Sequence, residues 1–68
     1  MADHVYKKVE LVGSSQSSVE DAIKGAVAKA KETIRNMRWF EVKEIRGQID
    51  DQEIAYWQVT IQIGFRVE

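Results

Sequence analysis

Four side chains that could bind an aromatic ligand lie in the second half of this chain: Trp39, Arg46, Gln58 and Arg66. An exposed indole ring offers a flat surface for stacking, and such a contact contributes about 1–3 kcal/mol per ring by analogy with nucleobases. A carboxamide both donates and accepts hydrogen bonds, so Gln58 can pair with a ring edge that carries imide or uracil-like groups. The four residues therefore predict a site for a flat heteroaromatic ligand.

These side chains can act together only if they share one face of a sheet. A strand is expected from about Arg38 to Ile49, but strict alternation along it would turn Ile45 outward. A β-bulge at Lys43–Glu44 removes this conflict, because two residues then oppose one on the partner strand. The bulge places the apolar side chains on one buried face: Phe40, Val42, Ile45, Gly47 and Ile49. Trp39 and Arg46 then share the other face.

The last segment, Ile54 to Glu68, alternates clearly enough to predict a strand. Its core face carries Trp57, Val59, Ile61, Ile63, Phe65 and Val67, and its outward face carries Tyr56, Gln58, Thr60, Gln62, Gly64 and Arg66. Strands are usually about five or six residues long. This one is expected to overhang any helix packed on it, and the overhang is a natural place for subunits to meet.

The first part of the chain supplies the remaining elements. A strand from His4 to Val12 is expected at or near a sheet edge, because Lys7 interrupts its apolar side. A helix follows from about Ser18 to Arg35, with Ser17 and Glu20 as a capping box. Its apolar stripe consists of Val19, Ile23, Ala26, Val27, Ala30 and Ile34. Gly25 within this helix indicates either a close contact with another backbone or a harmless substitution.

The elements predict a single α+β domain that spans residues 1–68. The order is strand, helix, strand, strand, with an antiparallel hairpin between the last two strands and a polar turn at Asp50–Glu53. The three-stranded sheet is expected to curl around the helix. In this arrangement Trp57 packs in the core, whereas Trp39 faces away from the helix.

Size and composition narrow the class of protein. A chain of 68 residues without cysteine buries too little apolar surface to be more than marginally stable alone, so we expect an oligomer. Ten basic residues interspersed with eleven acidic ones form no stripe suited to nucleic acid, and no apolar run is long enough for a membrane span. With His4 as the only histidine, no metal site is expected. The composition suits a soluble, cytoplasmic protein.

Several segments, taken together and in order, resemble the dodecins along essentially the whole chain. They are Tyr6–Gly13, Trp39–Val42, Glu44–Gly47, Gln58–Thr60 and Ile63–Arg66. The resemblance implies a β-α-β-β subunit that assembles into a hollow homododecamer and binds flavins in pairs between symmetry-related tryptophans.

The resemblance also implies roles for the four candidate residues. Trp39 would stack on the isoalloxazine ring, Gln58 would contact its pyrimidine edge, and Arg46 and Arg66 would lie near the phosphate of FMN. Riboflavin and FAD are alternative flavins. Dodecins of this type are also associated with coenzyme A, for which no residues are assigned. Arg38 departs from the family, whose members often carry aspartate at this position, so the local charge near the ring differs.

The expected function is flavin storage with suppression of flavin photochemistry, without enzymatic activity. The outward face carries no evident general base or nucleophile, and a ring held between aromatic faces leaves little room for a substrate. Two alternatives stay open from the sequence: a flavin-dependent redox enzyme subunit, and a protein-interaction module that binds no flavin.

Overall fold

The computed structural model describes residues 3–67 as one three-stranded antiparallel sheet and one helix. The elements are β1 (Tyr6–Ser15), α1 (Val19–Ala30), β2 (Met37–Asp50) and β3 (Glu53–Arg66). The sheet order is β1-β3-β2, so β3 is central and both neighbours pair with it antiparallel. This confirms the expected fold class, the edge position of the first strand and the hairpin between the last two strands.

The helix begins one residue later than the predicted capping box. Ser18 is the N-cap, and its side-chain oxygen accepts a hydrogen bond from the Asp21 amide at 3.0 Å. The Ser15 hydroxyl accepts from the Ser17 amide at 2.9 Å, which holds Ser17 in the preceding turn. The predicted pair of Ser17 and Glu20 is therefore wrong by one position.

The helix is also shorter than predicted and packs on a narrower set of residues. It ends at Ala30 rather than Arg35, because the chain must reverse to enter β2, and Asn36 adopts a left-handed backbone with φ 63°. Its buried residues, spaced four apart, are Ala22, Ala26 and Ala30. Of these, Ala22 lies outside the predicted stripe. The β-branched residues of that stripe are half-buried and pack against the edge of the core: Val19, Ile23, Val27 and Ile34.

Gly13 lets the helix lie close to the sheet. A Cβ atom at Gly13 would collide with the Ala22 carbonyl oxygen and would lie 3.0 Å from the Ala26 Cβ. Gly25 was the residue for which close contact was considered, but a Cβ atom there would meet nothing within 4 Å. The close approach thus depends on the strand glycine, and the helix glycine faces open space.

The predicted β-bulge is present. The pairing of β2 with β3 shifts between Val42 and Glu44, and it shifts again near each end of β2. Beyond the central bulge Ile45 lies opposite Val59, so it is on the helix side of the sheet as predicted. Trp57 lies on the same side, but it is only half-buried and lies outside the buried core cluster of Val59, Ile61 and Ile63 with the helix alanines.

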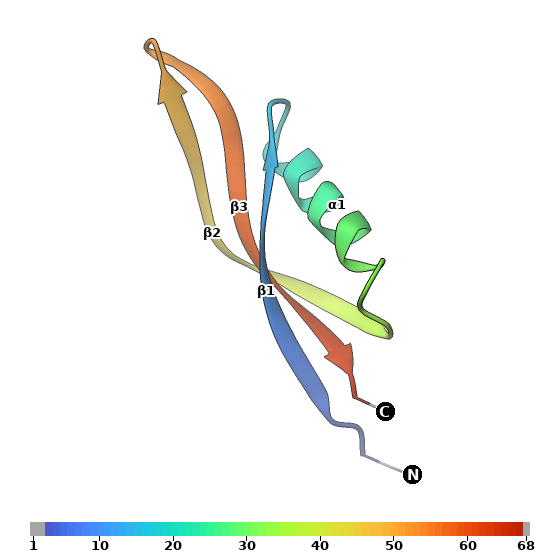
Figure 1. Cartoon of the computed structure of the whole chain (residues 1–68). Coiled ribbons are helices and arrows are strands. Elements are labelled where there is room, and N and C mark those ends of the chain that lie inside the picture. The colour runs from blue at the N-terminus through green and yellow to red at the C-terminus, as the bar shows by residue number, and fades with distance from the viewer. Residues whose placement is uncertain (1–2, 68) are drawn as a thin grey trace.

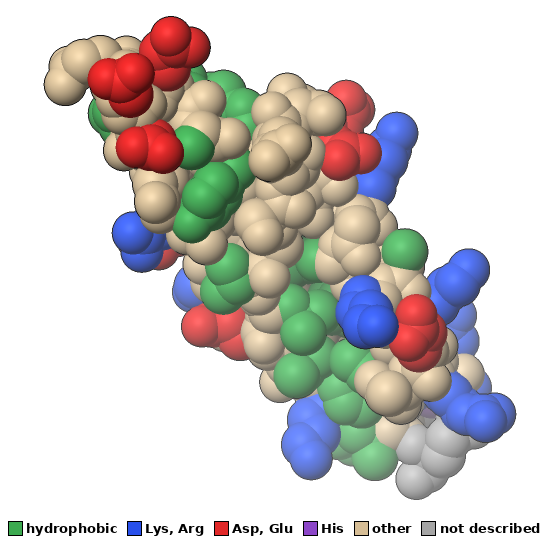
Figure 2. Space-filling model, turned by 45° about the horizontal axis from the view of Figure 1, so that its top comes forward, with side chains coloured by type: hydrophobic (Ala, Val, Ile, Leu, Met, Phe, Trp, Pro, Cys, Tyr) green, Lys and Arg blue, Asp and Glu red, His purple; other side chains and the backbone are tan. Residues whose placement is uncertain are grey.

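The hairpin extends well past the helix (Figure 1). The chain measures 56 × 20 × 13 Å, and the turn at the far tip consists of Asp51 and Gln52, both with positive φ. Two consecutive positive φ angles match the twist of the flanking strands. Figure 2 shows acidic side chains at this tip, together with a broken band of hydrophobic side chains along the molecule. The predicted overhang is therefore confirmed.

One expectation about β2 is wrong for the single subunit. The helix packs on β1 and β3, and of the helix-side residues of β2 only Met37, at its start, packs against the core cluster. Ile45 is 55% exposed and Ile49 is 71% exposed, and Phe40 and Val42 are exposed as well. The face predicted to be buried is therefore an apolar surface that the subunit itself leaves open.

Candidate ligand site on the outward sheet face

The Trp39 indole lies on the outward face of the sheet, over the backbone of the central strand. Trp39 on β2 pairs with Gly64 on β3. A Cβ atom at Gly64 would fall on the indole, about equally near three adjacent ring atoms: Cε2, Cζ2 and Cη2. Near-equal distances to three adjacent atoms are the geometry of contact with the ring face rather than its edge. One face of the indole therefore rests against Gly64, and the side chain remains 39% exposed.

A second aromatic residue holds this ring from the side. Tyr6 on β1 lies 5.3 Å from Trp39 between ring centroids, with the planes inclined by 68°. This edge-to-face arrangement is favourable for aromatic pairs. Neither Tyr6 nor Gly64 was predicted from the sequence to take part in the site. The alternation of the two strands already places both on the outward face, but only the cross-strand register reveals that they meet Trp39.

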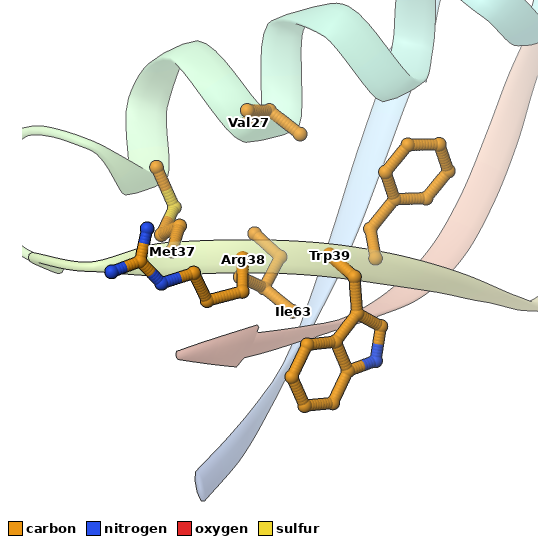
Figure 3. A pocket seen from close by; sticks show the side chains of 6 residues that line it. Val27, Met37, Arg38, Trp39 and Ile63 are labelled. Carbon is orange, nitrogen blue, oxygen red and sulfur yellow. The ribbon is translucent and has the colours of Figure 1, made fainter. Parts of the chain in front are cut away.

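Figure 3 shows the orientation of Trp39 relative to the helix. Its side chain lies on the opposite side of β2 from Val27, as expected from the sequence. On the helix side, a hollow of about 260 Å³ is lined mainly by apolar residues: Val27, Met37, Arg38, Trp39, Phe40 and Ile63. The open face of the indole and this hollow are thus separate features of the same stretch of β2.

Gln58 and Arg46 form a second group on the outward face. They are direct cross-strand partners, and Ser14 on β1 is the partner of Gln58 on the other side. Gln58 is half-buried and lines a hollow of about 360 Å³ with Ser14, Ser15, Gln16 and Tyr56. The Tyr56 hydroxyl donates a 2.7 Å hydrogen bond to Gln48, which ties the two strands together beside this hollow.

The structure does not bring the four candidate residues together within one subunit. Trp39 lies opposite Gly64 and Arg46 lies opposite Gln58, so the two groups are six residues apart along β3. At about 3.3 Å per residue this is about 20 Å of strand. Arg66 lies at the Trp39 end, where it is the cross-strand partner of Tyr6. A single aromatic ring cannot span this separation, so it could contact both Trp39 and Gln58 only if they came from different copies of the chain.

An ion pair crosses the outward face beside the indole. Lys8, the β1 partner of Gly64, places its Nζ 2.9 Å from the Glu41 carboxylate on β2. The hydrogen bond from Lys8 and its positive charge lower the pKa of Glu41 against a small opposing effect of desolvation, and Lys43 adds to the lowering. Both side chains are about half exposed. Within the ion pair the two opposite charges offset each other.

Among residues 3–67, no three His, Asp or Glu side chains are placed to hold a metal ion together. The helix within this range is too short and too polar to cross a lipid bilayer.

Comparison with known proteins identifies the family. The family described as Dodecin matches residues 5–68. This chain belongs to the dodecin family. Dodecin from Thermus thermophilus is 53% identical over 64 residues, which cover 94% of this chain and 93% of that protein.

Solved dodecins also share the fold. A Thermus thermophilus structure superposes with a TM-score of 0.92 at 52% identity and covers 97% of both chains. Dodecin from Streptomyces coelicolor gives a TM-score of 0.94 at 46% identity and covers 100% of this chain and 97% of its own. The Thermus thermophilus dodecin has also been solved with one tryptophan replaced by phenylalanine and with single arginines replaced by alanine.

Proposed function

We propose that this dodecin-family chain stores flavin by stacking it on Trp39. The observation that carries the proposal is the placement of the indole, which has one face on Gly64 and the other turned away from the sheet. A ring supported on one side and open on the other can accept one planar ligand on its free face. Stacking of this kind contributes about 1–3 kcal/mol per ring.

A single subunit cannot provide a strong site. Micromolar affinity requires about 8 kcal/mol, which is more than one stacked ring on an open sheet can supply. The proposed site therefore lies between copies of the chain, with two flavins stacked between two symmetry-related Trp39 rings. The separation of Trp39 from Gln58 supports this arrangement, because Gln58 can reach the edge of the same flavin only from another subunit.

The exposed apolar face of β2 supplies a reason for the chains to assemble. Its large side chains, exposed in the single subunit, are Phe40, Val42, Ile45 and Ile49. Exposed apolar surface of this extent on a small chain marks an association surface. We propose that the assembly is a homododecamer, as the family resemblance implies.

FMN is the flavin that fits the charged residues. Arg66 at the Trp39 end and Arg46 at the Gln58 end offer guanidinium groups that recognise a phosphate. Riboflavin lacks this group, and FAD carries an additional adenosine monophosphate group on it. In the proposed complex the indole also quenches an excited flavin by rapid electron transfer, which suppresses its photochemistry and serves storage rather than catalysis.

A titration of FMN followed by flavin fluorescence tests this function. The wild-type chain is expected to bind FMN and quench its emission, whereas Trp39→Ala is expected to lose at least about tenfold in affinity, which corresponds to 1.4 kcal/mol. Trp57→Phe is the matched control, because it changes the other tryptophan, on the helix side. Equal binding and quenching by wild type and Trp39→Ala would rule out the proposal.

The same preparation separates the alternatives. Several turnovers per bound flavin with an added electron donor would favour an enzyme subunit. Failure to take up FMN, riboflavin and FAD would favour a protein-interaction module. A parallel titration with coenzyme A, in competition with FMN, tests the second ligand that the family resemblance implies.

A further inference from the structure

We propose that Gly64 and Tyr6 are positioning residues for Trp39: Gly64 sets the height of the indole above the sheet, and Tyr6 sets its rotation. This inference rests on the proposed flavin site and names the residues that shape it. Neither residue needs to touch the ligand.

The role of Gly64 follows from the space that it leaves. The indole occupies the volume that a Cβ atom at position 64 would fill. Atoms of this kind pack best at about 3.5–4.0 Å, so a Cβ atom would push the ring outward by roughly 1 Å or would tilt it. The backbone of β3 cannot yield, because β3 is the central strand and is paired on both sides.

A small change in the height of the indole matters because the proposed pair of flavins lies in a slot between two symmetry-related indoles. In a sandwich between two symmetry-related copies, both indoles would rise, and the slot would narrow by roughly 2 Å, which is more than half the thickness of one stacked ring. A tilt would instead remove the parallel alignment that stacking requires. Either way, the pair of flavins loses its fit while the rest of the sheet is unchanged.

The role of Tyr6 follows from its edge-to-face contact. The indole is attached by two rotatable bonds, and the contact with Gly64 restrains its approach to the sheet but not its turning within the plane. Tyr6 lies 5.3 Å away at 68°, and it is anchored on β1 opposite Arg66. Tyr6 as a whole residue is also 44% exposed, so a substitution there removes little from the core.

Gly64→Ala tests the height of the ring. FMN affinity is expected to fall at least about tenfold, with weaker flavin quenching at saturation. Gly25→Ala is the matched control, since it makes the same change where a Cβ atom meets nothing within 4 Å. Circular dichroism and light scattering establish that each variant folds and assembles. If Gly64→Ala is folded and binds FMN like the wild type, the role of Gly64 is excluded.

Tyr6 variants test the rotation and do not depend on the folding of Gly64→Ala. Tyr6→Ala is expected to weaken FMN binding about threefold to tenfold, in line with the 0.5–1.5 kcal/mol of an aromatic pair. Tyr6→Phe retains the ring and is expected to bind FMN like the wild type. If it does, the weaker binding of Tyr6→Ala comes from loss of the ring and not from loss of the hydroxyl group. Equal binding by Tyr6→Ala and wild type would exclude this role. Failure of the wild type itself to bind FMN would instead reject the proposed function.

Discussion

At the residue scale, the outward face of the sheet is organised by contacts that side chains make across β3. Trp39 lies over Gly64, and the ion pair between Lys8 and Glu41 crosses the same strand next to it. Glycine leaves room for the indole to lie against the central strand, and the ion pair links β1 to β2 across that strand. This arrangement predicts a measurable effect on the titration of Glu41.

Replacing Lys8 by glutamine is expected to raise the pKa of Glu41 toward its ordinary value of 4.5, because the nearby charge disappears and the charged donor is replaced by at most a neutral one. The pKa of Glu41 is lowered in the folded chain. The ion pair therefore stabilises the folded state fully at pH values above 4.5, and this contribution is lost as the pH falls through the lowered value.

Carboxyl chemical shifts followed by NMR, over a pH range that extends on both sides of the ordinary pKa of 4.5, measure this change. Lys7→Gln is the control, because it removes the same charge from a neighbouring position that pairs with Phe65. An unchanged Glu41 titration in Lys8→Gln would show that the ion pair does not persist in solution.

At the element scale, the helix is held close to the sheet by small residues on both partners. The Ala22 carbonyl oxygen packs against Gly13 on β1, where a Cβ atom would collide with it. The helix presents alanines to the strands along its whole length. A narrow helix-to-sheet distance lets one short helix cover the centre of the sheet.

Gly13→Ala and Gly25→Ala are therefore expected to act in opposite directions. The first forces the helix away from the sheet and costs about 1–3 kcal/mol, as overpacking does. The second places alanine in a helix interior without a clash and stabilises by up to about 1 kcal/mol. Thermal unfolding at one fixed protein concentration measures both, because the stability of an oligomer depends on concentration. Equal midpoints for the two variants would contradict the packing described for Gly13.

At the scale of the whole molecule, the chain forms an elongated sheet whose apolar face is only partly covered by the helix. Its hairpin extends beyond the helix (Figure 1). The helix side of β2 exposes Ile45 and its neighbours. A 68-residue chain gains little from burial alone, so covering this face is expected to contribute much of the stability of the assembly.

Ile45→Asn is expected to shift the chain from the assembly to small species or unfolded monomer, because it places a polar group on a surface that other copies would bury. Ile45→Val is the control, since it retains an apolar side chain of similar shape. Size-exclusion chromatography with light scattering at matched concentrations measures the change. A full-size assembly formed by Ile45→Asn would show that this face is not an interface between subunits.

The sequence by itself determined the order of the elements, the bulge near Lys43, and the sheet faces of Trp39 and Gln58. These properties follow from alternation and spacing within short stretches, where neighbouring residues report directly on the local backbone. The resemblance to dodecins likewise depended on short segments in order, and the family match later confirmed it.

Only the tertiary structure decided that Gly64 supports the indole, that Trp39 and Gln58 lie about 20 Å apart along the sheet, and that the helix leaves β2 open. Each of these depends on which residues of distant segments lie opposite one another. Cross-strand register and helix placement result from the packing of the whole chain, so no local pattern encodes them.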